Sequence, residues 1–468
     1  MIKHKSFWSD ALVYTVGLLI VRSISFLLLP LHTNLLNPEV LGFVFLLLTL
    51  LAFLNTIFNH GMDSALLKFF HENNVKEVIS TSFLYSIFSS FIFIGILVAL
   101  KDLLFVSFIS KFSPLFFSLL ISSILFFDML SSRALNILRM TNKKYYFLFI
   151  CLINVVVSLA LNIILIGNLN LGFDGALLSI AGTATVQCVF LLPIILFYVK
   201  LYYFNFSTLL KMIKFALPLF PSAVFLIAIE LSDRWMLKWL DGVYSVGLYG
   251  AGYKIATLVL IIVNSFNLSW QPYYLKNFNK KYYENFMSIG TSFLLILLFL
   301  CTLLSATYPH IVEFSILGKH IINPRFWAGA AIIPIIAFSY FFYGLFILQM
   351  PSVYLKNKQN WVPAFWGCGL AVNVLSNLYL IPKFSFFGAA FATLFSYLSM
   401  SIFIVYKNSL WMPLKYSHKP IVELLIMSSL FLLICFNLSL SLLLFCVLLI
   451  LYCWRSLIVI KNYFVLPK

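Results

Sequence analysis

The sequence predicts an all-α polytopic membrane protein, and three observations lead to this fold class. Hydrophobic residues make up 63% of the 468 positions. Charged residues make up only 10%. The apolar residues also form about fourteen continuous stretches, and each stretch is near the roughly 20 residues that a helix needs to cross a bilayer. A water-soluble globule does not have this composition, so that class is excluded.

The expected transmembrane helices follow one another with short connections. In chain order they cover residues 8–32, 40–62, 78–100, 113–135, 145–167, 173–199, 211–234, 243–270, 286–308, 325–350, 361–381, 386–406, 419–437 and 439–460. The last two are separated only by a brief polar break that begins at Asn437. The first apolar run, which starts at Ala11, continues without a signal-peptide cleavage site, so we expect an uncleaved first helix.

The basic balance of the chain follows its predicted topology. The formal net charge is +17, which in a soluble protein would suggest nucleic-acid binding. Here most Lys and Arg lie in the even-numbered loops and at the two ends of the chain. Because short cytoplasmic loops of membrane proteins are enriched in Lys and Arg, we expect both termini to be cytoplasmic. The same explanation removes the argument for a nucleic-acid partner.

An internal repeat divides the predicted helices into two halves. Residues 138–180 parallel residues 353–395, with Asn162 opposite Asn377. The two stretches hold helices five and six and helices eleven and twelve. This repeat predicts two pseudosymmetric six-helix bundles plus helices 13 and 14, a plan that in transporters places the substrate between the halves. The expected domains are residues 1–205, 206–410 and 411–468.

Two cations lie inside predicted spans. Arg22 lies deep in the first span, and Lys254 lies in the eighth, each on a stripe of polar side chains. A cation in the hydrocarbon core costs at least ~2.5–3.5 kcal/mol on insertion scales, so it should face a cavity or a partner. Arg22 and Lys254 are therefore the predicted substrate-binding residues, and together they favour an anionic passenger. The alternative for Arg22 is a structural pair with Asp128 or Glu230.

Carboxylates form the second group of candidates. The stretch ELSDRWMLKWLD (230–241) holds Glu230, Asp233 and Arg234 at the predicted external end of the seventh span. A structural ion-pair cluster that closes the outer mouth is one interpretation. Coupling of transport to H+ or Na+ is the other, because intramembrane carboxylates commonly act in proton relays. Asp128 and Asp63 are similar candidates for a gate or for ion coupling, near the cytoplasmic side.

The chain shows no signature of enzyme chemistry. Its seven Cys form no CxxC pair and lie mostly in apolar runs, which indicates small buried hydrophobic residues and neither disulfides nor metal ligands. There is no Walker A, HExxH or GxSxG motif. We therefore expect no catalytic residues, no bound cofactor and no metal site.

Six segments carry distinctive motifs. They are SFLLLPLHTNLLNPEVLGF (25–43), GMDSALLKFF (61–70), FALPLFPSAV (215–224), LSDRWMLKWLDGVYSVGLYGAGYKIA (231–256), LSWQPYYLK (268–276) and FFGAAFATLFSYL (386–398). Together they resemble the Wzx-type flippases of oligosaccharides and O-antigen. Those flippases belong to the multidrug/oligosaccharidyl-lipid/polysaccharide (MOP) exporter superfamily.

The resemblance implies two six-helix bundles around a V-shaped central cavity, plus helices 13 and 14. It implies a passenger, an undecaprenyl-diphosphate-linked oligosaccharide repeat unit, which alternating access turns from the inner to the outer leaflet. It also implies the bacterial cytoplasmic (inner) membrane as location, with a polysaccharide polymerase and a chain-length regulator as partners. Arg22 and Lys254 would then hold the pyrophosphate or acidic sugars. One departure is Lys68, where family members commonly have Arg, so a bidentate contact is lost while the charge stays.

Two other functions stay open on the sequence. A cation-coupled exporter of drugs or metabolites from the same superfamily would favour acidic cavity residues, so Glu230 and Asp128 support it while Arg22 and Lys254 oppose it. A membrane enzyme such as a polysaccharide polymerase usually has a large external loop. The longest external loop expected here, 309–325, is short.

Overall fold

The computed structural model describes residues 20–21, 24, 26–70, 74–105, 108–277, 283–316, 319–414, 416–437 and 442–463. Eleven helices in these ranges are long and apolar enough to cross a membrane. The strands described there are only β1 (Ser315–Ile316) and β2 (Lys319–His320), which pair in an antiparallel hairpin. The all-α polytopic class is thus confirmed. The count of fourteen spans and the cytoplasmic termini stay predictions, and most of the first span, 8–32, lies outside the described residues.

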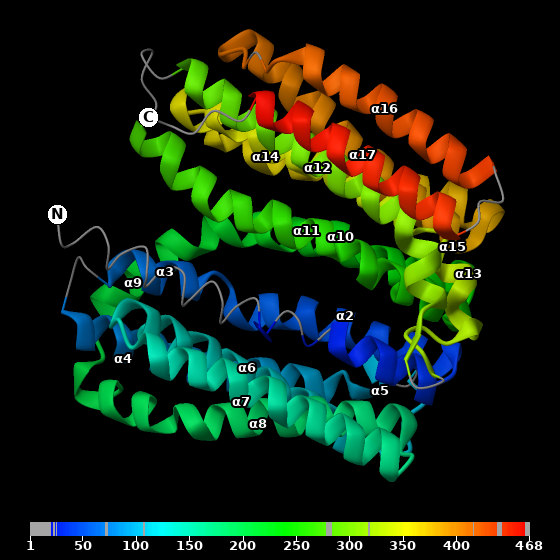
Figure 1. The fold of residues 1–468 in the computed structure, drawn as a ribbon. Coiled ribbons are helices and arrows are strands. Elements are labelled where there is room, and N and C mark those ends of the chain that lie inside the picture. Colours follow the sequence, from blue (N-terminus) through cyan, green and yellow to red (C-terminus); the bar gives the residue numbers. More distant parts are fainter. Residues whose placement is uncertain are drawn as a thin grey trace. The chain divides into compact units, whose positions relative to one another are not determined.

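The chain forms two compact units, Met1–Ala228 (unit 1) and Ile229–Lys468 (unit 2). The elements of unit 1 in Figure 1 are α2 (Pro38–Asn59), α3 (Met62–Phe69), α4 (Val75–Ala99), α5 (Lys101–Phe105), α6 (Pro114–Met140), α7 (Lys144–Asn162) with a π-helical extension η1 (Ile163–Asn168), α8 (Gly172–Tyr198), η2 (Leu201–Tyr203), α9 (Phe206–Ala216) and η3 (Leu217–Leu219). A short apolar helix, Phe26–Leu35, precedes them. The next helix, α10 (Phe220–Leu240), begins in unit 1 and ends in unit 2.

Unit 2 is built around long helices. Its elements are α11 (Val243–Asn277), α12 (Tyr283–Glu313), the β1–β2 hairpin, η5 (Pro324–Phe326), α13 (Trp327–Ala330), α14 (Ile333–Leu355), η6 (Gln359–Trp361), α15 (Val362–Trp411), α16 (His418–Asn437) and α17 (Leu442–Tyr463). The helices α16 and α17 pack on α12, where the Phe431 and Tyr452 rings stack at 4.5 Å between centroids. The last helix pair therefore belongs to unit 2, while the predicted division at 205/206 and 410/411 stays a prediction.

Local sequence signals set where the helices begin. Asn37 caps α2 by accepting a hydrogen bond from the Val40 amide at 2.8 Å, and Pro38 occupies the first turn. Ser113 caps α6 in the same way by accepting a hydrogen bond from the Phe116 amide, and Pro114 occupies the first turn of that helix. In each pair the capping side chain accepts a hydrogen bond from a backbone amide of the first turn that has no partner within the helix. Proline has no amide hydrogen, so it leaves no donor unsatisfied there.

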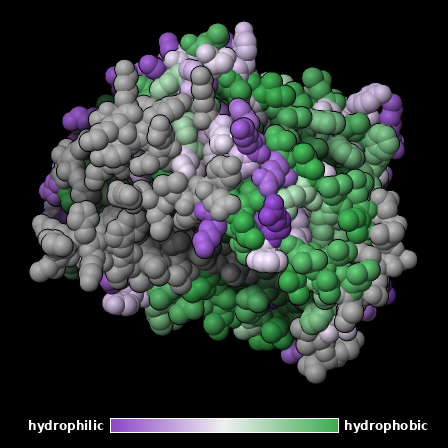
Figure 2. All heavy atoms as spheres, turned by 45° about the horizontal axis from the view of Figure 1, so that its top comes forward, coloured by the Kyte–Doolittle hydropathy of each residue, from purple (hydrophilic) through white to green (hydrophobic). Residues whose placement is uncertain are grey.

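Hydrophobic side chains face outward along the spans. Phe91 is 64% exposed, Leu196 65% and Leu375 68%. Figure 2 shows hydrophobic residues over much of one face of the molecule, with hydrophilic residues gathered in narrower groups. A soluble monomer rarely exposes large contiguous apolar patches. Together with the eleven apolar helices, this surface identifies a multi-pass membrane protein.

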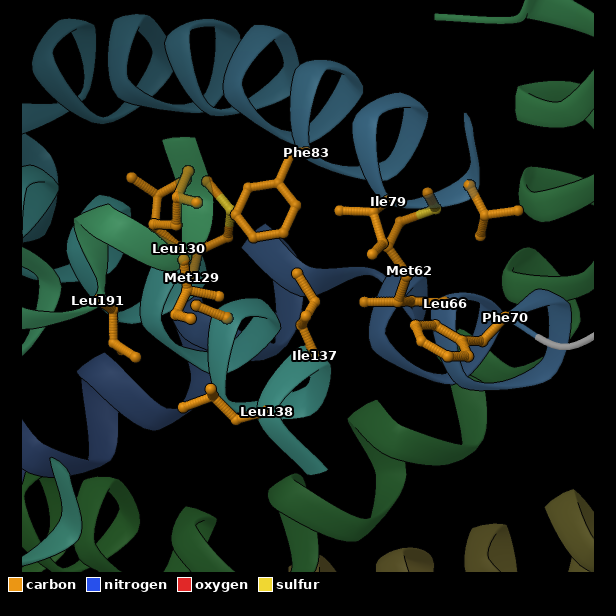
Figure 3. Packing of buried hydrophobic residues seen from close by; sticks show 14 of the residues in the cluster. Met62, Leu66, Phe70, Ile79, Phe83, Met129, Leu130, Ile137, Leu138 and Leu191 are labelled. Atoms are coloured by element: carbon orange, nitrogen blue, oxygen red, sulfur yellow. The ribbon is translucent and has the colours of Figure 1, made fainter. Parts of the chain in front are cut away.

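The core of unit 1 gathers at the end that contains α3. Met62 and Leu66 of α3 pack with Ile79 and Phe83 of α4 and with Ile137 of α6, as Figure 3 shows. All five are fully buried. Close packing of this kind leaves little freedom for α3 to shift against its neighbours. The short helix therefore holds its polar side chains at fixed positions.

The chain turns sharply between α2 and α3. His60 has φ 32° and Gly61 has φ 82°, so both occupy the left-handed region. A β-carbon on Gly61 would lie 2.8 Å from the main-chain oxygen of Ala216 in α9. Glycine at position 61 therefore serves two needs, because it permits the positive φ and lets α9 approach the turn closely. The predicted span 40–62 ends at this turn.

The predicted spans 361–381 and 386–406 correspond to α15, which is interrupted at Ser385 (φ 53°, ψ −134°). The predicted span 211–234 differs more. Pro218 lies in the 3-10 turn η3 between α9 and α10, and α10 then continues to Leu240. The interruption has a physical cause, since proline cannot donate the backbone hydrogen bond that a helix interior requires.

Replacing Gly61 by Ala should destabilise unit 1. The left-handed backbone costs about 1–2 kcal/mol for an L-residue, and the clash with Ala216 adds to that cost. The apparent melting temperature of the purified protein in detergent should fall by several degrees. Gly95→Ala is the matched control, because a β-carbon at that helical position meets nothing within 4 Å. Equal melting temperatures for G61A and the wild type would contradict the role of this turn.

Candidate functional site

A buried carboxylate lies at the centre of a polar cluster in unit 2. Asp233 of α10 is 0% exposed. Its Oδ2 accepts a hydrogen bond from the Tyr249 hydroxyl of α11 at 2.8 Å and another from the Thr393 hydroxyl of α15. Its Oδ1 accepts from the Asn377 amide of α15 at 2.8 Å. The cluster therefore joins three helices through one carboxylate.

Two further amide and hydroxyl groups extend this cluster. The Asn377 amide also donates to Oδ1 of Asn373 at 3.0 Å, and that oxygen accepts from the Ser232 hydroxyl at 3.0 Å. The Oδ1 atom of Asn377 has no hydrogen-bond partner within the described part of the chain. Carboxylate, amide and hydroxyl oxygens are the ligands that hard cations prefer. Among the described residues, the hydrogen bonds to Asp233 come from hydroxyl and amide groups.

Arg234 lies beside a group of buried tyrosines. Its guanidinium donates to the main-chain oxygen of Glu230, one turn earlier in α10, at 3.2 Å. It also lies over the Tyr253 ring at 4.6 Å from the centroid, a cation–π arrangement that stabilises a cation away from water. The Tyr253 hydroxyl accepts from Tyr340 of α14 at 2.7 Å. Glu230 lies within electrostatic range of this group.

Lys254 is the residue after Tyr253 in α11, and it is partly buried. Arg234 lies within electrostatic range of its ammonium group. The backbone of α11 is held close to α13 here, because a β-carbon on Gly252 would lie 2.1 Å from the main-chain oxygen of Gly329. Lys254 and Arg234 are thus within electrostatic range of one another. The sequence predicted a substrate contact for Lys254 and Arg22 and placed Arg234 at the outer mouth.

A second polar cluster is buried in unit 1. Asp63 of α3 accepts hydrogen bonds from Asn59 at 2.6 Å and from the Ser132 hydroxyl of α6 at 2.7 Å. The Arg133 Nε lies 4.0 Å from Oδ1 of Asp63, and this arginine is 0% exposed. Its Nη2 also donates to Oδ1 of Asn59 at 3.4 Å. Asp63 is thus part of an ion pair that ties the α2–α3 turn to α6.

Arg133 was missed by the sequence analysis, which placed it at the cytoplasmic edge of the span 113–135 and counted it with the loops. Because α6 extends to Met140, Arg133 lies two turns inside the helix end. No local pattern in the sequence indicated its burial, because its partner Asp63 lies far earlier in the chain, in GMDSALLKFF (61–70).

Of the remaining predicted site residues, Asp128 is in neither cluster. Asp128 of α6 is partly buried, and no hydrogen bond or ion pair involves it among the described residues. It lies within electrostatic range of Cys188 of α8. Arg22 lies outside the described residues, so its predicted role is untouched by the structure. Asp233 lies two turns before the end of α10 and is enclosed by α11 and α15.

No group of three or more His, Cys, Asp or Glu side chains that could hold a metal ion occurs among the described residues. The two carboxylate clusters each contain a single acid surrounded by hydroxyl and amide groups or by arginine. Transition-metal chemistry generally uses several nitrogen or sulfur ligands.

A family model described as "Polysaccharide biosynthesis protein" matches residues 7–278, which is more than half of the chain. The chain belongs to this polysaccharide biosynthesis family. A search of curated protein sequences found no match. The family match agrees with the resemblance found in the sequence motifs.

Solved structures show that this family member has the fold of MOP superfamily transporters. The lipid II flippase MurJ in an inward closed conformation aligns with a TM-score of 0.77 and 13% identity, over 97% of this chain and 98% of that one. An inward-facing multidrug resistance MATE family transporter aligns with a TM-score of 0.64 and 14% identity, covering 85% and 97%. A MOP superfamily transporter from Pyrococcus furiosus gives 0.53 and 14%, covering 86% and 95%. These relatives are transporters and flippases and not enzymes.

Removing one partner of the unit 1 ion pair should destabilise the protein. Arg133→Met leaves Asp63 without its cation, and breaking a buried pair typically costs about 3–5 kcal/mol. We expect the lower end, because the Asp63 side chain is 18% exposed. Asp63→Asn keeps the acceptor for Ser132, so the double variant D63N/R133M should be more stable than R133M alone.

The measurement for this pair is the melting temperature of all four forms in the same detergent. Coupling between contacting groups is typically about 0.5–3 kcal/mol. Strictly additive losses would show that Asp63 and Arg133 do not stabilise one another.

Proposed function

We propose that this protein is a flippase that moves undecaprenyl-diphosphate-linked oligosaccharide repeat units, of O-antigen or capsule, from the inner to the outer leaflet of the bacterial cytoplasmic membrane. The observation that carries the proposal is membership of the polysaccharide biosynthesis family. The fold supports it, because a solved structure with the same fold over 97% of this chain is a lipid II flippase. A polysaccharide polymerase and a chain-length regulator would act on the flipped product.

The cations of unit 2 supply the recognition of such a passenger. Lys254 of α11 and Arg234 of α10 are within electrostatic range of one another. A diphosphate carries several negative charges, and such charges interact more strongly in a desolvated site than in water. In this proposal Lys254 contacts the diphosphate and Arg22, assigned from the sequence, contributes a further cation. Arg234 is the position that the structure adds.

The ion that drives the cycle would bind at the Asp233 cluster. Asp233 accepts hydrogen bonds from neutral donors only, so a proton or Na+ would compensate its charge. Binding of the ion would alter the contacts that link α10 to α11 and α15, and so favour one state of the transport cycle. Glu230, Asp128 and Asp63 remain further candidates for gating or coupling. Of these, Asp63 forms an ion pair with Arg133.

The alternative is a cation-coupled exporter of drugs or metabolites. The similarity in fold to a MATE family transporter supports this alternative. A cationic drug would be repelled by the Lys254–Arg234 pair, whereas an anionic lipid would be attracted. Transport of an undecaprenyl-diphosphate sugar and of a cationic dye, measured on the same proteoliposomes, separates the two functions. Dye export without lipid flipping would overturn the flippase proposal.

Lys254→Ala should strongly reduce flipping. A hydrogen bond to a charged group contributes about 1.5–3 kcal/mol, which corresponds to a loss of roughly 10- to 150-fold. The measurement is surface polysaccharide in cells whose only copy is the variant, normalised to the amount of protein in the membrane. Lys254→Arg should retain most of the activity because the positive charge remains.

Lys383→Ala is the matched control for this experiment, since Lys383 is exposed and contacts only Tyr379 through its ammonium. The control should export like the wild type. Normal export by a well-expressed R22A/K254A double variant would sink the anion-binding proposal.

Asp233→Asn should uncouple transport from the ion gradient. The amide preserves the size of the side chain but removes the charge that a proton or Na+ would compensate. The measurement is the flipping rate in proteoliposomes with and without a Na+ gradient or a pH gradient. We expect a gradient-dependent rate in the wild type and a slow, gradient-independent rate in D233N. Glu423→Gln, at an exposed acid of α16, is the control and should keep the gradient response.

A further inference from the structure

The segment 199–219, called the connector here, links α8 to α10 and is fixed to the beginning of α4. The Ser80 hydroxyl donates to the Tyr198 main-chain oxygen at 3.1 Å and accepts from the Lys200 amide at 3.0 Å. The Asn205 amide donates to the Thr81 hydroxyl at 3.1 Å. These side chains belong to the first turns of α4. The connector therefore has a defined position on unit 1.

The helix within the connector, α9, has one buried and one exposed face. Leu209, Met212 and Ala216 point into the core of unit 1 and are at most 6% exposed. Phe206 and Leu210 point outward and are 63% and 53% exposed. A helix with this pattern, at the end of a membrane bundle, is typical of segments that lie along the headgroup region. In Figure 1, α3, the start of α4 and α9 lie at the same end of unit 1.

Exposed aromatic and aliphatic side chains also occur in η2, just before α9 in the chain. Leu201 is 80% exposed and Tyr202 75%, and both lie in η2. Such groups favour the boundary between acyl chains and headgroups, where an apolar body and a polar tip can both be satisfied. A soluble phosphate compound would leave these apolar side chains in water. The chemistry thus indicates a lipid surface.

Six lysines occur in the connector and at the beginnings of α4 and α7. They are Lys76, Lys143, Lys144, Lys200, Lys211 and Lys214. Among the described residues of the connector and of the adjoining first turns of α4 and α7, the one carboxylate is Glu77, and it accepts a hydrogen bond from the Thr208 hydroxyl. The local charge is therefore strongly positive.

Several of these ammonium groups are held over aromatic rings. Lys143 lies 5.6 Å from the Phe197 ring centroid and 5.7 Å from that of Tyr198. Lys76 lies 5.8 Å from the Tyr203 ring centroid. Such contacts restrict the lysine side chains without neutralising their charge. The cations thus stay near the aromatic groups and remain available to an external anion.

We propose that the connector, with the adjoining ends of α4 and α7, is a binding site for anionic phospholipid headgroups. The lysine ammonium groups contact the lipid phosphates, while Tyr202, Phe206 and Leu210 enter the acyl–headgroup boundary. Polybasic segments at membrane surfaces bind acidic lipids in this way. The predicted orientation places the site at the cytoplasmic leaflet. Bound lipid would fasten unit 1 to the membrane at the point where the chain leads into α10.

The test is lipid binding by the full-length protein in detergent, followed by native mass spectrometry with phosphatidylglycerol or phosphatidylcholine of identical acyl chains. The wild type should retain phosphatidylglycerol preferentially. The triple variant K143Q/K200Q/K211Q should lose that preference by about tenfold or more. The matched triple variant K143R/K200R/K211R should keep it. Raising the ionic strength should weaken the wild-type preference, because salt screens exposed charges.

A second triple variant, K356Q/K358Q/K407Q, is the control for charge removal elsewhere. Lys356 and Lys358 are exposed, and Lys407 lies 4.1 Å from the Trp361 ring centroid, so the set also combines lysines with an aromatic ring. It should keep the wild-type lipid preference. An equal loss in this control, or full preference in the connector variant, would overturn the proposal.

A folding defect is distinguished by comparing the melting temperatures of all variants in phosphatidylcholine. If the triple connector variant does not fold, Lys200→Gln alone and the salt dependence of the wild type decide the question. A wild type that binds both lipids equally would overturn the proposal. The result is independent of flipping, because K254A should lose transport and still prefer phosphatidylglycerol.

Discussion

A charge in the hydrocarbon core has no water to stabilise it, so the protein itself must supply the partner. This constraint influences how the helices pack within each unit. In unit 1 the Asp63–Arg133 pair joins the α2–α3 turn to α6. In unit 2 the Asp233 carboxylate draws Tyr249, Asn377 and Thr393 from two other helices. Each cluster adds directional contacts between helices to the apolar packing.

The two units satisfy the constraint in chemically different ways. The unit 1 acid is matched by an arginine, so its charge is already compensated. The hydrogen bonds described for the unit 2 acid come from hydroxyl and amide groups. This difference is the reason that we propose ion coupling at Asp233 and a mainly structural role for Asp63.

Much of the fold was predictable from the sequence, because apolar runs of bilayer length are a strong and local signal. The predicted spans over 78–100, 145–167 and 173–199 match α4, α7 with η1, and α8 to within a few residues. The paired Asn162 and Asn377 of the repeat are both buried and both bind a residue from an earlier helix, His32 and Asp233 respectively. In each case an apolar background made the polar residue conspicuous.

The site was less predictable, because its contacts join residues far apart in the chain. Arg133 and Asp63 are separated by the helices α4 and α5, and no local pattern links them. Asp233 was expected at the external end of the predicted span 211–234. Pro218 instead shifts the helix start to Phe220, so that Asp233 falls inside α10. Burial and partner choice depend on packing, which periodicity does not reveal.

The charges on α10 also bear on how the protein enters the membrane. Among the described helices, α10 does not meet the apolar criterion for a span, although it is long enough to cross. Its Asp233 binds Asn377, which is synthesised 144 residues later. At roughly 5–20 residues per second this interval is on the order of 10–30 s. During that time the Asp233 carboxylate lacks its partner on α15, so the packing of α10 is complete only after α15 has been made.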